Sequence, residues 1–134
     1  MAENELVDDK SIPDTDRLFR RVAPNQLSPN EDGSKRPSSS VFKTDRMSVN
    51  IETLMIEQGR PPEDTLTKYP NEYLTSISVN DVRSFGCYPV VKDTQPPNDP
   101  AHGLVLGKKK DSFANKMLRN HKWIVEPLKV STEK

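Results

Sequence analysis

The sequence has little of what disulfide bonds and metal sites require. Cys87 is the only cysteine among the 134 residues, so the chain can form no internal disulfide and no cysteine-rich metal site. The two histidines, His102 and His121, fall in different predicted elements. No zinc ligand set can be assembled from them and the scattered acidic residues at the usual spacings. We therefore expect neither a metal ion nor a cofactor.

Long apolar runs and an excess of one charge are missing as well. No apolar run approaches the ~20 residues of a membrane span, and the acidic start at 1–5 lacks the pattern of a signal peptide. Together with the single cysteine, this predicts a cytosolic (cytoplasmic) protein without membrane contact. Twenty basic and twenty acidic side chains cancel, so binding to nucleic acid would need a local basic patch.

The composition nevertheless indicates one folded domain with long polar loops. The apolar fraction of 32% is low and the 12 prolines are many, but Leu, Val and Ile are clustered in segments. We predict a flexible N-terminal arm over 1–15, a single α+β domain over 16–128 and a C-terminal tail over 129–134. The domain is expected to hold a small mixed sheet of about five or six short strands, with two or three short helices.

Periodicity places the elements within that domain. In 46–51, Met47, Val49 and Ile51 alternate with polar residues, which is typical of a half-buried strand. The predicted strands are 17–22, 46–51, 74–79, 87–92, 102–107 and 123–128, and the predicted helices are 52–58, 80–86 and 112–121. We interpret the strand at 102–107 as central. The long loop at 23–37 is either functional or disordered.

His102 begins the strand at 102–107, directly after a loop that holds three prolines. A histidine in such a place can act as a general base or bind a ligand. Alternatively it bonds the loop backbone and holds 97–101 in place. This structural role is favoured, because a functional loop residue needs a pocket beside it.

Arginine and serine residues give a second group of candidates. Arg20 and Arg21 lie in the strand at 17–22, and an arginine on its buried side needs a partner, because a lone buried charge is costly. Ser38 and Ser40 follow Pro37 and either present hydroxyl groups to a ligand or belong to an ordinary surface loop.

The basic run Lys108, Lys109 and Lys110 precedes the last predicted helix. These lysines could bind an anion together with the amides at the start of that helix. The favoured alternative is a solvated turn that protects a sheet edge. Extended through 108–122, the basic segment could form a patch for nucleic acid. Cys87 is interpreted as a buried, unreactive thiol.

Four short patterns carry a resemblance. They are Leu18-Phe19-Arg20-Arg21-Val22, Arg36-Pro37-Ser38-Ser39 with Phe42, Met47-Ser48-Val49, and Asn98-x-x-x-His102-x-x-Val105-x-Gly107. Together they resemble a group of short bacterial proteins of uncharacterised function, over about residues 16–126, and the resemblance implies no known activity.

The order of a strand arginine, a Ser-x-Ser segment and a strand followed by a helix is also similar, more distantly, to the layout of ADP-ribosyltransferases. In that layout an arginine or histidine holds the nicotinamide nucleotide, a hydroxyl strand shapes the pocket and a glutamate activates the ribose. The resemblance assigns these roles to Arg20 or Arg21, with Ser38 and Ser40. For the glutamate, Glu57 and Glu126 are available, but neither stands in a Glu-x-Glu or Gln-x-Glu pattern.

These observations predict a small cytosolic binding or interaction module, without evident catalysis, that joins a protein partner in a larger bacterial assembly. One alternative is a nucleotide-binding enzyme of ADP-ribosyltransferase-like type, which would use Arg20 or Arg21, the two serines and His102 around one pocket. The other alternative is a nucleic-acid-binding protein that uses the basic segment 108–122.

Overall fold

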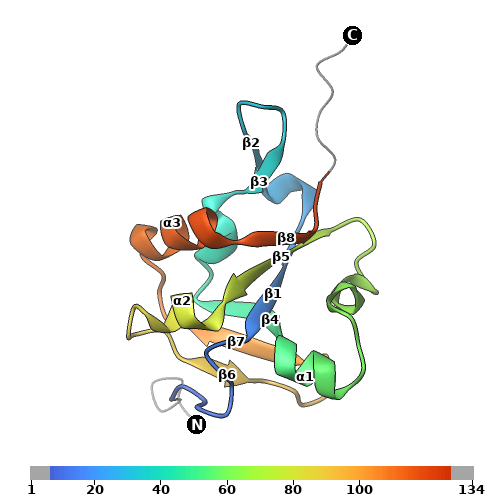
Figure 1. The fold of residues 1–134 in the computed structure, drawn as a ribbon, viewed down its shortest axis with the longest axis vertical. Helices are drawn as coiled ribbons and strands as arrows, with labels where there is room; N and C mark the ends of the chain where they lie inside the picture. Colours follow the sequence, from blue (N-terminus) through green and yellow to red (C-terminus); the bar gives the residue numbers. More distant parts are fainter. Residues whose placement is uncertain (1–6, 128–134) are drawn as a thin grey trace.

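The computed structural model describes residues 7–127, and strands from this part of the chain form one six-stranded sheet (Figure 1). The strand order is β6-β7-β4-β1-β5-β8. These strands are β1 (Arg17–Val22), β4 (Arg46–Ile51), β5 (Tyr73–Ser78), β6 (Val90–Lys92), β7 (His102–Leu106) and β8 (Lys122–Val125). The α-helices are α1 (Glu52–Glu57), α2 (Val79–Arg83) and α3 (Asp111–Asn120). The predicted α+β class is confirmed.

Two details of the predicted sheet are corrected. All described pairings are antiparallel, where the sequence analysis expected a mixed sheet. Helices α1 and α2 span six and five residues, and such short helices cannot make the long crossover that parallel neighbours require. The strand at 102–107 is not central either, because β7 lies between the edge strand β6 and β4.

Alternation along the strands divides the core between the two faces of the sheet. Leu18 and Val22 of β1 point to one face, where they join Phe42 and Phe113 in the larger buried cluster. Helices α2 and α3 lie on this side, together with the 3-10 helix η3 (Ser39–Phe42) (Figure 1). Phe19 points to the opposite face. This second face carries α1 and the 3-10 helix η4 (Pro62–Leu66), and the cleft described below lies there.

The long loop at 23–37 is folded. It contains the 3-10 helix η2 (Pro24–Gln26) and a small hairpin of β2 (Leu27–Pro29) and β3 (Lys35–Pro37). The hairpin is attached to the domain by the Trp123 indole, which donates a hydrogen bond to the Lys35 carbonyl at 3.3 Å.

The segment at 7–15, which was predicted to belong to a flexible N-terminal arm, packs on the domain. Ile12 is 1% exposed in the core. The amide of Asp9 donates to the Val90 carbonyl at 2.9 Å, and Arg83 forms ion pairs with Asp8 and Asp14. The reason is that β6 is a short edge strand whose free backbone groups need partners. The predicted tail at 129–134 and the first six residues lie outside the described part of the chain.

Within residues 7–127, no helix combines the length and the apolar character that crossing a membrane demands.

Candidate functional site

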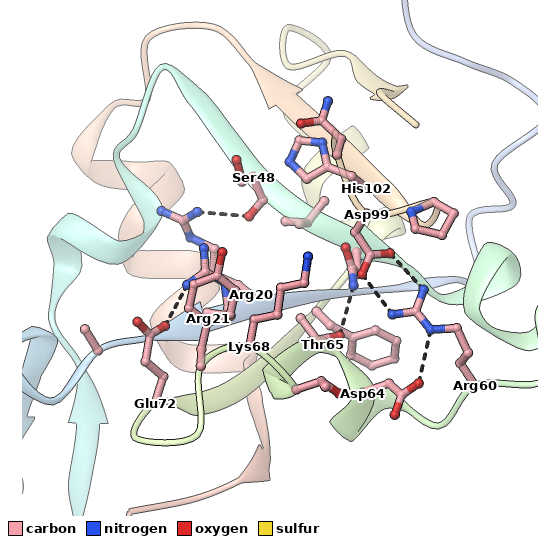
Figure 2. Close-up of a pocket in the computed structure, with 18 of the residues that line it drawn as sticks. Arg20, Arg21, Ser48, Arg60, Asp64, Thr65, Lys68, Glu72, Asp99 and His102 are labelled. Atoms are coloured by element: carbon pink, nitrogen blue, oxygen red, sulfur yellow. Dashed lines mark hydrogen bonds and ion pairs between the residues drawn. The ribbon is translucent and has the colours of Figure 1, made fainter. Parts of the chain in front are cut away.

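A polar cleft with a volume of about 720 Å³ opens on the sheet face that carries α1 and η4 (Figure 2). Its floor is formed by residues of β1, β4 and β7. One wall comes from residues between 60 and 72, around η4, and the other from the loop at 97–100. The volume falls in the range of about 300–1,000 Å³ that is usual for small-molecule sites.

Arg20 lies on the cleft at a place where two strands separate. β1 and β4 are paired at Leu18 with Ile51 and at Phe19 with Asn50, and the registered pairing stops there. The Arg20 guanidinium reaches from β1 toward β4 beyond this point.

The guanidinium of Arg20 donates to neutral oxygens. The acceptors are the carbonyls of Val41 at 3.1 Å and Ser48 at 2.9 Å and the hydroxyl of Thr44 at 3.2 Å. Within the described residues, no carboxylate pairs with Arg20. Burial, and then the neighbouring charge of Arg21, lower the pKa of Arg20 to about 10, while the negative charge of Glu72 acts in the opposite direction.

Arg21 lies beside Arg20 but is fully partnered. Its guanidinium forms an ion pair with Glu72 at 2.9 Å and stacks on the Tyr69 ring, 3.5 Å from the ring centroid. An arginine on this side of β1 was predicted to need a partner, and Glu72 is that partner.

Arg60 joins the two walls at the other end of the cleft (Figure 2). It donates two hydrogen bonds to Asp99, both at 2.8 Å, and a weaker one to Asp64 at 3.2 Å. The hydrogen bonds from Arg60 hold the pKa of Asp99 below its usual value, and the bonds to Asp99 raise the pKa of Arg60. This ion pair ties the segment around η4 to the loop at 97–100.

We expect the substitution Asp99→Asn to lower the free energy of unfolding by about 1–2 kcal/mol, because the two-pronged ion pair is only partly exposed. Urea unfolding measures the loss. Since the pKa of Asp99 is lowered from 3.8, its contribution is present above that pH and declines as the pH falls below it. The difference between wild type and variant therefore shrinks below about pH 4.

Asp64→Asn is the matched control, because Asp64 meets Arg60 through one longer contact and its side chain is 43% exposed. This variant is expected to lose less than about 0.5 kcal/mol. Equal losses in the two variants would contradict the role assigned to Asp99.

His102 lines the cleft and is also tied to the loop that precedes it. Its Nδ1 lies 3.1 Å from the Asp93 carbonyl oxygen and 3.1 Å from the Asp93 carboxylate. Its backbone amide donates to the Asp99 carbonyl at 2.9 Å. His102 thus makes the loop contacts expected of a structural histidine and has an adjacent pocket.

The predicted serines lie outside the cleft. The Ser38 hydroxyl is 3.0 Å from the Ser28 hydroxyl, and Ser40 is exposed in η3. Neither serine lines the cleft, and neither do Glu57 and Glu126, the glutamates considered with the ADP-ribosyltransferase layout.

The three lysines of the basic run differ in how deeply they are buried. Lys109 is 5% exposed, and its ammonium donates to the carbonyls of Thr44, Asp45, Val105 and Gly107. Backbone oxygens already surround the Lys109 ammonium, and the ligand contact suggested for it stays a prediction. Lys108 and Lys110 are exposed and do not line the cleft.

Cys87 was interpreted as a buried thiol, and this is wrong because it is exposed. It lies in the turn before β6 rather than in the strand that the sequence predicted from 87, since β6 begins at Val90.

Sequence reasoning missed the residues of the two cleft walls, above all Arg60, Lys68, Glu72 and Asp99. The available signal was weak. A polar segment at 60–72 with one tyrosine, between a helix and a strand, indicates a functional loop but not what it faces. In the described part of the chain, no three His, Cys, Asp or Glu side chains are grouped so that they could hold a metal ion.

Comparisons of this chain with family models, with curated proteins and with solved structures find no match. The resemblances to uncharacterised bacterial proteins and to ADP-ribosyltransferases therefore stay predictions.

Proposed function

We propose that this chain is a non-catalytic binding module whose cleft receives an anionic group of its partner. The observation that carries the proposal is the Arg20 guanidinium, which is partly buried on the cleft and bonded only to neutral oxygens within the described residues. A buried cation without a counter-charge is costly, and an incoming anion removes that cost.

The other half-buried arginines of the described chain are treated differently. Four of them in the described residues have a carboxylate partner, in the pairs Arg17–Glu52, Arg21–Glu72, Arg60–Asp99 and Arg83–Asp14. The domain thus supplies acidic partners to arginines on both sides of its sheet but not to Arg20. This contrast supports an anion from outside the chain as the missing partner.

Arg20 also keeps the hydrogen-bond donors that such an anion needs. A guanidinium carries five N–H groups. Nε, Nη1 and Nη2 of Arg20 each make one bond, which leaves one N–H on Nη1 and one on Nη2. Two N–H groups on neighbouring nitrogens suit a two-pronged contact with an oxyanion.

The acidic groups on the cleft favour binding over catalysis. Glu72 is paired with Arg21, and Asp64 and Asp99 are paired with Arg60. Acid–base catalysis by a carboxylate works best with a pKa raised toward neutrality, whereas Arg60 lowers the pKa of Asp99. The nucleotide-binding enzyme considered above would find Arg20, Arg21 and His102 on the cleft, but none of its serine or glutamate candidates.

The setting of this module is part of the proposal. The single cysteine favours a reducing, cytosolic compartment, and the bacterial assembly with a protein partner rests on the resemblance of the sequence to short bacterial proteins.

Titration with inorganic phosphate at constant ionic strength tests the proposal, with calorimetry as the readout. We expect Arg20→Gln to weaken binding by about tenfold, because it removes a charge-assisted contact. Arg36→Gln is the matched control. Arg36 also donates to neutral oxygens, Pro29 O and Asn30 Oδ1, but it lies in the exposed hairpin and outside the cleft.

Two results would contradict the proposal. One is a folded Arg20→Gln protein that binds phosphate as the wild type does. The other is measured on the wild type alone, in case Arg20→Gln does not fold. There, an NMR titration with phosphate should move the Arg20 Nε–H signal and leave the Arg36 signal in place, and an unmoved Arg20 signal would count against the cleft.

A further inference from the structure

Lys68 is the second cation of the cleft without an acidic partner. It lies after η4 on the wall opposite the loop at 97–100, and Figure 2 shows its side chain extended into the middle of the cleft. Its ammonium makes no hydrogen bond or ion pair with any residue of the described chain. By comparison, two ammonium groups elsewhere in the described chain are partnered: Lys43 pairs with Asp111, and Lys116 donates to Ser84.

Arg20 and Lys68 approach the cleft from different elements. Arg20 comes from the sheet floor, at the separation of β1 and β4, whereas Lys68 comes from the wall formed around η4 (Figure 2). A carboxylate offers two oxygens in one plane. A tetrahedral oxyanion offers oxygens that diverge, so that one group can meet the fork of Arg20 and the ammonium of Lys68 from two sides.

The charges elsewhere in the cleft confine the anion to this side. Arg60, at the opposite end, faces the two carboxylates Asp64 and Asp99, so that end has an excess of negative charge. A ligand with two separate carboxylates would place one of them there and meet repulsion. A ligand whose two negative charges belong to one group near Arg20 and Lys68 avoids this repulsion.

We infer that the cleft binds a phosphate monoester, with Arg20 and Lys68 contacting the same dianionic group. The inference rests on the proposed function and adds the class of the anion. A phosphate monoester carries a charge of about −1.5 to −2 at pH 7, which matches two cations without acidic partners.

Two probes of the same shape and different charge test the inference. Ethyl phosphate is a dianion at pH 7.5 and ethyl sulfate is a tetrahedral monoanion. The affinity of the full chain for each is measured by calorimetry at one ionic strength. We expect ethyl phosphate to bind the wild type about tenfold more tightly than ethyl sulfate.

Lys68→Gln should weaken the binding of ethyl phosphate more than that of ethyl sulfate and so remove this preference, because the Lys68 ammonium attracts a dianion more strongly than a monoanion. The variant should fold normally, since Lys68 is exposed and makes no bond in the described chain. Lys108→Gln is the matched control, an exposed lysine outside the cleft that should keep the preference.

Equal affinities of the wild type for the two probes, or a preference that survives in Lys68→Gln, would overturn the phosphate inference. Neither result touches the proposed function, which stands as long as Arg20→Gln weakens anion binding. Absence of binding by every anion would instead overturn both.

The source of the phosphate is distinguished by a third probe, a capped tripeptide with a central phosphoserine. Tighter binding of this peptide than of ethyl phosphate assigns the group to a phosphorylated protein partner. Equal affinity assigns it to a small phosphorylated molecule. Both results support a phosphate monoester as the ligand.

Discussion

We expect Lys109→Met to lower the free energy of unfolding by about 3–5 kcal/mol, the scale seen when a buried charged contact is broken from one side. The Lys109 ammonium donates to the carbonyls of Thr44 at 2.8 Å, Val105 at 2.8 Å and Gly107 at 2.7 Å. A methionine fills similar space but leaves these oxygens without their donor. Each buried polar group left without a partner costs about 1–3 kcal/mol.

The hydrogen bonds of Lys109 stabilise the fold because they connect two neighbouring strands. Thr44 precedes β4, Gly107 follows β7, and Val105 lies within β7. Lys109 thus connects the beginning of β4 to the end of its antiparallel neighbour β7, just before α3 begins. Urea unfolding at pH 7 measures the loss. Lys110→Met is the control, because Lys110 is an exposed neighbour, and its change should stay within about 0.5 kcal/mol.

The loss of stability caused by Lys109→Met depends on pH. Burial lowers the pKa of Lys109 from 10.5 to about 8. Between these pH values the unfolded chain holds the proton that the folded chain has released, so the stability of the wild type gains a contribution as the pH rises from about 8 to 10.5. Lys109→Met lacks this gain, and the gap between the two proteins should widen from pH 7 to pH 9.5. A gap that narrows would contradict a lowered pKa of Lys109 in the folded protein.

Lys109 shows where sequence reasoning reaches its limit. Three successive lysines look alike in the sequence, and the ordinary expectation for such a run is a solvated turn. Lys108 and Lys110 fulfil it, whereas Lys109 is buried. Lys109 turns inward because carbonyl groups of β7 and of the residues before β4 lie close together around its ammonium. These carbonyls come together only in the folded sheet.

Elements that depend on local periodicity could be predicted well. The strand expected at 46–51 matches Arg46–Ile51, and the helix expected at 112–121 matches Asp111–Asn120 within one residue at each end. Both segments bury residues at a regular spacing, and the apolar residues show that spacing directly in the sequence. Strand order and the direction of pairing depend on contacts between distant segments, and the expected mixed sheet with β7 at its centre was wrong for that reason.

The cleft depends on contacts between residues that are far apart in the sequence. Arg60 and Asp99 are 39 residues apart and Arg21 and Glu72 are 51 apart, yet these pairs hold its walls and its floor together. Arg20 could be chosen as a candidate from the sequence because it is a charged residue next to apolar residues in a predicted strand. Its lack of an acidic partner could not be predicted, because this requires the position of every carboxylate in the fold.

Gly103→Ala is the second substitution with a large expected effect, a loss of about 2–3 kcal/mol from overpacking. A Cβ atom at Gly103 would lie 2.5 Å from Cδ1 of Ile51 and 2.8 Å from the carbonyl oxygen of Val91. Ile51 is fully buried, and Val91 belongs to β6, which pairs with β7. Neither neighbour can yield freely, so β6 and β7 must move apart or Ile51 must adopt a strained rotamer.

A double substitution separates the two contacts. Ile51→Val removes the Cδ1 atom and alone should cost about 0.5–1.5 kcal/mol. In the Gly103→Ala background it should cost less or restore stability, because it relieves the side-chain clash, while the clash with the Val91 carbonyl remains. We expect the double variant to stay below the wild type in urea unfolding. Full recovery would show that β6 takes no part in the strain.

The effect of Gly103→Ala should reach the cleft, because Gly103 follows His102, which lines it. If β7 shifts to accommodate the new methyl group, the contacts of His102 with Asp93 move with it. We therefore expect the affinity for phosphate to fall in Gly103→Ala even where the protein remains folded, and to rise again in part with Ile51→Val. A variant that loses stability but binds phosphate as the wild type does would place the strain in β6 alone and leave the cleft independent of it.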